Sequence, residues 1–169
     1  MLRLGLFGVI GALISVGSAL ASEPQRDPIV AEAIQPVVRA LEETKARHAL
    51  LPPPRTDAEK LIRMGELEQA PRQALSAMQL GRLTEDEKRE AWSAVWRLLR
   101  PIDKANQEAL LAMLPPEGWF PISRYGREAA KSAFLIVQHS EPALWRRFLP
   151  TIEGMVARGE AEGPTYALM

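Results

Sequence analysis

The sequence predicts an all-α fold, a single domain of about five or six helices packed around a central apolar helix at about residues 126–139. Apolar residues recur at the helical period in every patterned segment, and no segment shows the sustained alternation of a half-buried strand. Residues 133–137 read AFLIV without a polar break, which indicates a helix surrounded by other elements. The length of 169 residues suits one domain with a substantial hydrophobic core.

Residues 1–21 have the pattern of a secretory signal peptide. Arg3 precedes an apolar segment that ends in Ala-Leu-Ala at residues 19–21, the small-x-small pattern that signal peptidases accept. We expect cleavage before Ser22, a periplasmic or secreted location, and contact with a membrane only transiently, through the signal peptide. The alternative is an uncleaved anchor, since residues 4–20 approach the roughly 17 to 25 residues that span a bilayer.

Residues 22–56 are expected to form an N-terminal helix followed by a Pro-rich connector. The apolar pattern extends over residues 28–50, and Pro36 is expected to kink the helix or restart it. His48 lies near its end, where an imidazole usually just interacts with the negative end of the helix dipole. The connector LPPP at residues 51–54 is stiff, and Asp57 after it is a suitable cap for the next helix.

Residues 57–169 are expected to form the main helical domain, whose first helix carries a charged pair around Pro71. Glu68 and Arg72 are four residues apart and would pair on one face, worth only ~0.3 to 0.5 kcal/mol if exposed. Alternatively, Pro71 bends the helix and turns Gln69 and Arg72 toward the centre of the fold.

The next helix begins at a capping box formed by Thr84 and Glu87. Its buried stripe is expected to comprise Trp92, Val95, Trp96 and Leu99. Pro101 is expected to kink the helix or to start a new segment. Asp103 and Asn106 continue the spacing of the apolar face, so each must be hydrogen-bonded or lie beside a wet cleft, because burying it unpaired would cost several kcal/mol.

The central helix is expected to end near His139, because Pro142 sits just inside the start of another helix. Phe134, together with Trp96, is expected in the core. Gln138 and His139 therefore lie at the C-terminal end of the most buried helix, where a polar-tipped side chain can face a cleft. The helix that follows is closed by Gly159.

The composition excludes several classes of function. Lys plus Arg and Asp plus Glu number 21 each, so nothing electrostatic favours a nucleic-acid partner. The chain has no Cys, which excludes thiolate zinc sites and Cys nucleophiles. It shows no Ser-His-Asp order with a nucleophile elbow, no Gly-rich phosphate loop and no His-x-x-x-His pair. We expect no cofactor and no metal, since His139 and Asp103 supply only two ligands.

Several short motifs between residues 57 and 169 follow the order found in one known family. The motifs are Glu68-Gln69-x-x-Arg72, Asp103-x-x-Asn106, Gly118-Trp119 with Gly126, and Gln138-His139 before a helix that contains Leu149-Pro150. In these positions the chain resembles the bacterial domain-of-unknown-function family 6624. It departs from the family's Asp-Gln at Glu68-Gln69, and from its Gly-Trp-Pro by the insertion of Phe120.

The resemblance also implies that the chain lacks its C-terminal end. The family's pattern continues past the equivalent of Met169 into an Asp-Arg segment and a terminal Tyr-Gly-Thr-Gln. The turn and cap at residues 163–165 point the same way, because only four residues follow and one isolated turn of helix does not hold itself together. The family carries no assigned reaction, so the resemblance supports the choice of positions alone.

The polar positions predict one concavity between the central helix and the helix after Pro101, where Asp103, Asn106 and His139 converge. The leading hypothesis is an exported domain that binds an unknown small molecule or a protein partner through a cleft beside Gln138 and His139. The ligand-binding candidates are Asn106, Gln138, Arg72 and Gln69. The alternative is a hydrolase-like enzyme in which His139 is the general base and Asp103 orients its ring. A metal site is the third interpretation, although His139 and Asp103 supply only two of the three or more protein ligands that zinc normally has. A purely structural network that ties the helices together is the alternative to all three.

Overall fold

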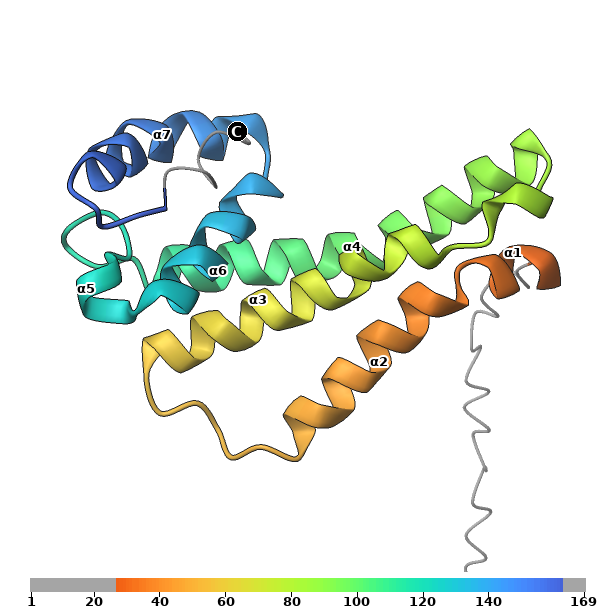
Figure 1. The fold of residues 1–169 in the computed structure, drawn as a ribbon, viewed down its shortest axis with the longest axis horizontal. Helices are drawn as coiled ribbons and strands as arrows, with labels where there is room; N and C mark the ends of the chain where they lie inside the picture. Colours follow the sequence, from red (N-terminus) through yellow and green to blue (C-terminus); the bar gives the residue numbers. More distant parts are fainter. Residues whose placement is uncertain (1–26, 163–169) are drawn as a thin grey trace, which may run out of the picture.

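The computed structural model describes residues 27–162 and confirms the all-α fold (Figure 1). These residues form seven α-helices and two short 3₁₀ helices, with no strand among them. The α-helices are α1 Pro28–Ala33, α2 Gln35–Ala49, α3 Asp57–Gln73, α4 Glu85–Ala112, α5 Ile122–Tyr125, α6 Arg127–Gln138 and α7 Pro142–Ala157; the 3₁₀ helices are Ala74–Ala77 and Leu80–Arg82. The expected signal peptide and the expected turn at residues 163–165 lie outside the described residues.

The described helices outnumber the five or six expected because two segments are divided. Ile34 ends α1 and caps α2, and Pro36 then occupies the first turn of α2, where a missing backbone N–H costs no hydrogen bond. The restart expected at Pro36 is therefore confirmed. The short helix α5 lies directly before α6, and Gly126 separates the two with a φ of 80°, a backbone conformation that favours glycine.

Helix α3 lies between α2 and α6 and also packs against α4 (Figure 1). The helix begins one residue after Thr56, whose hydroxyl accepts a hydrogen bond of 3.1 Å from the backbone N–H of Glu59. The cap is thus Thr56 and not the expected Asp57, because the Thr side chain can reach the free N–H groups of the first turn. Its position makes α3 the helix from which side chains can reach both α2 and α6.

Helix α4 links two hydrophobic clusters along its length. It has 28 residues and is therefore about 42 Å long. Its N-terminal half packs against α1 in a cluster that also includes α2, and its C-terminal half packs against α3 and α6 in a cluster that also includes α7. The largest fully buried members of the first cluster are Val30, Ile34, Val37, Val95 and Leu99, and those of the second are Leu61, Leu110, Trp119, Phe120, Ile136 and Ile152.

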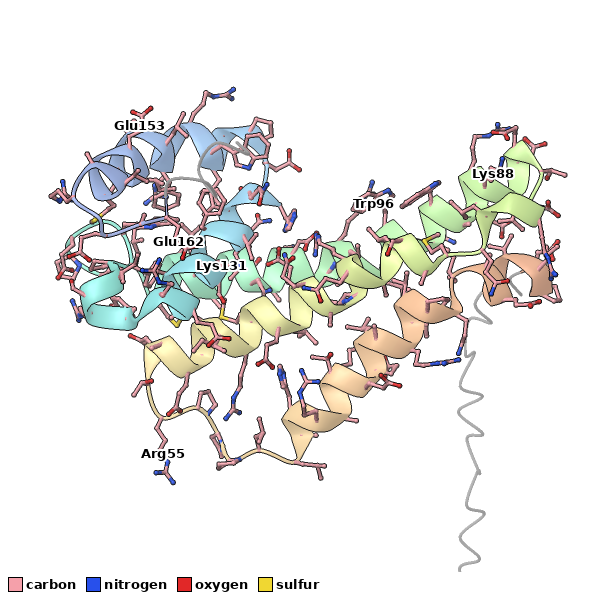
Figure 2. The ribbon with its side chains drawn as sticks, viewed as in Figure 1. Arg55, Lys88, Trp96, Lys131, Glu153 and Glu162 are labelled. Atoms are coloured by element: carbon pink, nitrogen blue, oxygen red, sulfur yellow. The ribbon has the colours of Figure 1, made fainter. Side chains whose placement is uncertain are left out.

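The expectation that Trp92 and Trp96 belong to the buried stripe of α4 is wrong. Their exposed fractions are 36% and 40%, and Figure 2 shows Trp96 pointing away from the helix. The face that packs against α1 carries small side chains instead, and it consists of Ala91, Ala94, Val95 and Leu99. Close approach of two helices favours such small residues, so the bulky indoles are displaced to the flank of the stripe.

The prediction of an apolar central helix is confirmed by α6. Phe134 is buried at 5% exposure, and the helix ends with His139 as its C-terminal cap. Pro71, Pro101 and Pro150 lie inside α3, α4 and α7, and each of these helices continues past its proline. Pro101 therefore does not start a new segment. No helix within residues 27–162 has the length and apolar composition needed to cross a bilayer.

Candidate functional site

The candidate site contains a fully buried carboxylate on α3. Glu68 has no exposed surface, because it continues the stripe of Leu61 and Met64 that α3 turns toward the core. Its Oε1 is paired with Nδ1 of His139, the residue that caps α6. A carboxylate on one helix therefore holds the imidazole at the end of another.

Arg72 lies one helical turn beyond Glu68 and connects it to α4. Its Nη1 donates a hydrogen bond of 3.1 Å to the backbone oxygen of Glu68 and lies 3.8 Å from the Oε1 of that residue. Its Nη2 donates to Oδ1 of Asp103 at 2.7 Å. The guanidinium is only 11% exposed. His139, Glu68, Arg72 and Asp103 thus form one continuous chain of polar contacts, which we call the polar cluster.

The ring of His139 is oriented by Glu68, and not by Asp103 as expected. Asp103 makes no hydrogen bond to His139 within the described residues, and its carboxylate is held by Arg72 instead. The i,i+4 spacing of Glu68 and Arg72 also fits an exposed pair, which is why Glu68 is not among the predicted site residues. The spacing of Leu61, Met64 and Glu68 is the signal that places this carboxylate on the apolar stripe of α3.

The side chain of Asn106 forms a hydrogen bond inside the protein. The residue is 5% exposed, and its Nδ2 donates a hydrogen bond of 3.1 Å to the backbone oxygen of Met64. This bond joins α4 to α3 next to the polar cluster. Asn106 shares the region of Asp103, as expected from their spacing, but its amide is used inside the protein.

The protonation of Asp103 reflects its buried position. Burial raises the pKa of this carboxyl, and the nearby charge of Glu68 adds to the rise. The hydrogen bond and charge of Arg72, and the charge of His139, act in the opposite direction but do not outweigh burial. The carboxylates of Asp103 and Glu68 are therefore close enough to influence each other.

The Nε2 atom of His139 is the ring nitrogen that the polar cluster leaves without a partner. The side chain of His139 is 27% exposed, and Nε2 is neither buried nor hydrogen-bonded within the described residues. By contrast, Oε2 of Glu68 is buried and has no partner there. Among residues 27–162, no group of three or more His, Cys, Asp or Glu side chains could hold a metal ion.

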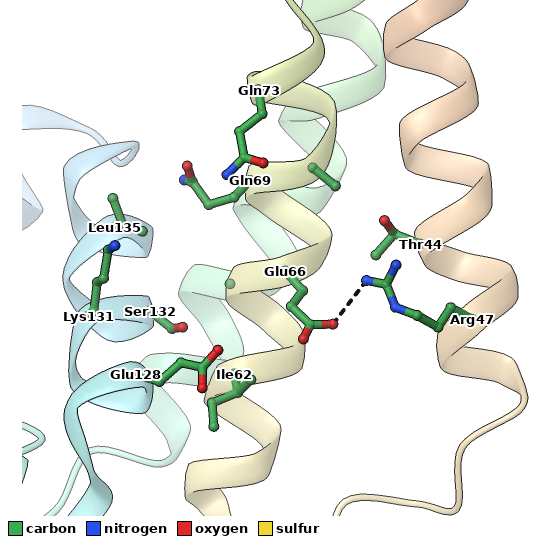
Figure 3. Close-up of a pocket in the computed structure, with 12 residues that line it drawn as sticks. Thr44, Arg47, Ile62, Glu66, Gln69, Gln73, Glu128, Lys131, Ser132 and Leu135 are labelled. Atoms are coloured by element: carbon green, nitrogen blue, oxygen red, sulfur yellow. Dashed lines mark hydrogen bonds and ion pairs between the residues drawn. The ribbon is translucent and has the colours of Figure 1, made fainter.

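A groove of about 500 Å³ lies between α2, α3 and α6, and neither Gln138 nor His139 lines it (Figure 3). Gln138, the last residue of α6, is half-buried. Gln69 is the one expected ligand-binding residue that faces the groove. The lining residues are Thr44 and Arg47 from α2, then Ile62, Gly65, Glu66, Gln69, Ala70 and Gln73 from α3, and finally Glu128, Lys131, Ser132 and Leu135 from α6.

The α2 side of the groove carries charges that are already paired. Arg47 donates to Oε2 of Glu66 at 3.1 Å (Figure 3). Nε2 of His48 lies 2.6 Å from the same oxygen. The hydrogen bond to His48 is the main reason that the pKa of Glu66 lies below its usual range, and Arg47 adds to this effect. His48 therefore joins α2 to α3, in addition to lying in the last turn of its helix.

The α6 side carries charges that are not paired. Lys131 and Glu128 are exposed, and neither side chain forms an ion pair or a hydrogen bond within the described residues. Their charged ends point in different directions along the groove, with the carboxylate toward Ile62 and the ammonium toward Leu135 (Figure 3). Across from them, Nε2 of Gln69 is buried and has no hydrogen-bond partner in the described part of the chain.

Comparisons with models of known protein families, with curated proteins and with solved structures found no significant match. The resemblance to family 6624 therefore stays a prediction.

Proposed function

We propose that the protein binds a short zwitterionic peptide in the groove between α2, α3 and α6. This binding site differs from the cleft expected beside Gln138 and His139, because neither residue lines the groove. The observation that carries the proposal is the presence of two opposite, unpaired charges, Lys131 and Glu128, on one wall of an open groove. A charged side chain without a partner inside the protein is available to a ligand of opposite charge.

The two charges suit a ligand whose own charges are separated. Residues three apart on a helix have Cβ atoms about 5–6 Å apart, and the side chains of Glu128 and Lys131 then diverge (Figure 3). A tripeptide spans roughly 10 Å when extended. Its ammonium group would lie on Glu128 and its carboxylate on Lys131.

The amide groups of the opposite wall suit the peptide backbone. Gln69 has a buried Nε2 without a partner, and such a group carries a cost of about 1–3 kcal/mol until an acceptor satisfies it. A peptide carbonyl group is such an acceptor. Gln73, one turn along α3, extends the same polar wall.

The size of the groove agrees with this ligand class. Small-molecule sites in proteins usually measure about 300–1,000 Å³ and combine apolar walls with a few polar groups. The groove has a volume of about 500 Å³. Its lining includes the apolar residues Ile62, Ala70 and Leu135 in addition to the polar ones. This leaves room for small side chains on the peptide.

Calorimetric titration with trialanine tests the proposal. Trialanine should bind saturably, while trialanine blocked by an N-terminal acetyl group and a C-terminal amide should bind much more weakly because it lacks both charges. Lys131→Gln and Glu128→Gln should each weaken binding about tenfold or more, the loss expected for one charge-assisted hydrogen bond.

Lys104→Gln is the matched control for these variants. Lys104 lies on α4, is 79% exposed and does not line the groove, so its replacement should leave trialanine binding unchanged. The proposal is wrong if charged and blocked trialanine bind alike, if neither binds, or if Lys104→Gln weakens binding as much as Lys131→Gln.

A further inference from the structure

The two histidines of the chain offer an internal comparison. Both contact a glutamate of α3, His48 contacting Glu66 and His139 contacting Glu68. They use opposite ring nitrogens, since His48 contacts its glutamate through Nε2 and His139 through Nδ1. The accessible nitrogen of the ring therefore differs between them.

The contact with Glu68 fixes the tautomer of a neutral His139. A carboxylate accepts a hydrogen bond, so the ring proton must lie on Nδ1 and the lone pair on Nε2. Glu68 is fully buried and is fixed further by Arg72. The lone pair of Nε2 consequently points away from the buried carboxylate, at an atom that is neither buried nor bonded in the described part of the chain.

The surroundings also suit a reaction in which Nε2 gives up its lone pair. Glu68 supplies a buried negative charge at Nδ1, and His139 caps the C-terminus of α6, where the helix dipole is negative. A reaction at Nε2 that makes the imidazole cationic is favoured by both effects. This is the arrangement in which a carboxylate orients and supports a reactive histidine.

We propose that Nε2 of His139 is a nucleophile that transfers an acyl group from an activated ester to water. The Nε2 lone pair forms a bond to the carbonyl carbon, and the ester C–O bond breaks with its electron pair on the departing alcoholate. The Nδ1 proton stays hydrogen-bonded to Glu68, which balances the charge of the acyl-imidazolium. Water then attacks the acyl carbon, the C–N bond breaks, its electrons return to Nε2, and a proton goes to solvent.

In this reaction His139 is the catalytic residue, and Glu68, Arg72 and Asp103 are positioning residues. Glu68 holds the ring, Arg72 holds Glu68, and Asp103 holds Arg72. The site needs no contact with the peptide groove, because His139 does not line it. The acyl-transfer activity is thus independent of trialanine binding.

The test is hydrolysis of p-nitrophenyl acetate by the full chain, which is monitored through the release of p-nitrophenolate. The rate of hydrolysis by the wild type should exceed the rate with N-acetylhistidine at equal concentration by about tenfold or more, as expected for a positioned and activated group. His139→Gln should reduce the rate of hydrolysis to that of N-acetylhistidine in the same buffer. His48→Gln, the matched control, should keep the wild-type rate, because the His48 ring is less exposed than that of His139 (15% against 27%) and its partner Glu66 is not buried as Glu68 is.

Two further measurements separate a chemical role of the cluster from a structural one. Glu68→Gln should lower kcat more than it raises KM, while a variant that merely loosens the fold would show a lower melting temperature in circular dichroism. Diethyl pyrocarbonate, mapped by mass spectrometry on the wild type, should modify His139 about tenfold faster than His48, because the His139 ring is the more exposed one and is supported by a buried carboxylate. Equal esterase rates for wild type and His139→Gln, or faster modification of His48, would overturn the proposal.

Discussion

At the scale of single residues, the polar cluster combines two carboxylates, one guanidinium and one imidazole that are mostly removed from water. Arg72 serves both Glu68 and Asp103, so its charge is shared between them. Each carboxylate consequently receives less compensation than it would in a simple pair. Buried ion pairs repay their desolvation only when the geometry and the remaining hydrogen bonds are good, and Oε2 of Glu68 has no partner in residues 27–162.

Asp103→Asn tests whether burial outweighs the Arg72 pair. The folded pKa of Asp103 is raised, so the native carboxyl keeps its proton to a higher pH than the unfolded one. The wild type should therefore lose stability relative to Asp103→Asn as the pH rises from the unfolded value near 3.8 through the raised folded value. Urea unfolding of both proteins between about pH 3.5 and about pH 7 measures the difference. The opposite slope would mean that Arg72 dominates.

The sequence allowed part of the cluster to be predicted. Asp103 and Asn106 were identified by their position on an apolar stripe, and His139 by its place at the end of a buried helix. Glu68 was not identified, because an i,i+4 pair with Arg72 also fits an exposed face. Which of two nearby carboxylates reaches the imidazole depends on how α3, α4 and α6 are oriented, and helical spacing does not determine that.

At the scale of the helices, α3 and α6 meet with little space between them. A Cβ atom added to Gly65 would lie 2.7 Å from Cβ and 3.3 Å from Cα of Ser132. Gly65 and Ser132 both line the groove, so this close approach fixes the floor of the proposed binding site. The position of α6 relative to α3 therefore depends on the absence of a side chain at residue 65.

Gly65→Ala should destabilise the protein. The clash should cost up to about 3 kcal/mol, which outweighs the gain of about 1 kcal/mol in helix propensity. The matched control is Gly154→Ala in α7, where a new Cβ would meet only the flexible side chain of Arg158, at 3.4 Å. Gly154→Ala should be neutral or stabilising by up to about 1 kcal/mol. Urea denaturation showing the two variants equally stable would contradict the close packing of α3 and α6.

The helices themselves were largely predictable, while their contact faces were less so. Apolar spacing and capping signals identified the α6 segment and its end at His139, and the capping box of Thr84 and Glu87 is present at the start of α4. Trp92 and Trp96 have the same period as the true stripe and are more apolar than alanine. Hydrophobicity therefore favoured them, whereas the close contact with α1 required Ala91 and Ala94.

At the scale of the whole molecule, the groove and the reactive histidine lie at different places around α3. Glu66 faces the groove and α2, whereas Glu68 faces α6 and α4, because residues two apart on a helix point to nearly opposite sides. One helix thus presents a paired charge to the ligand site and a buried carboxylate to the polar cluster. The groove was not predicted, since it depends on the spacing of α2 and α6, which are distant in the sequence.

The location of the protein in the cell remains a proposal that rests on residues 1–21. We propose export with cleavage before Ser22, into the periplasm or the medium. A peptide-binding groove is compatible with that location. Mass spectrometry of the protein recovered from the producing cell should show Ser22 as the first residue. Intact Met1 on a membrane-bound form would instead support the uncleaved anchor.

The most direct measurement of the central proposal is an NMR titration of the isotope-labelled full chain with trialanine. The side-chain amide resonances of Gln69 and Gln73, and the backbone resonances of residues 128–135, should shift together and saturate. The resonances of Gln138 and of the His139 ring should stay in place, because neither residue lines the groove. Shifts confined to Gln138 and His139, or no shifts at all, would contradict binding of a zwitterionic peptide between α2, α3 and α6.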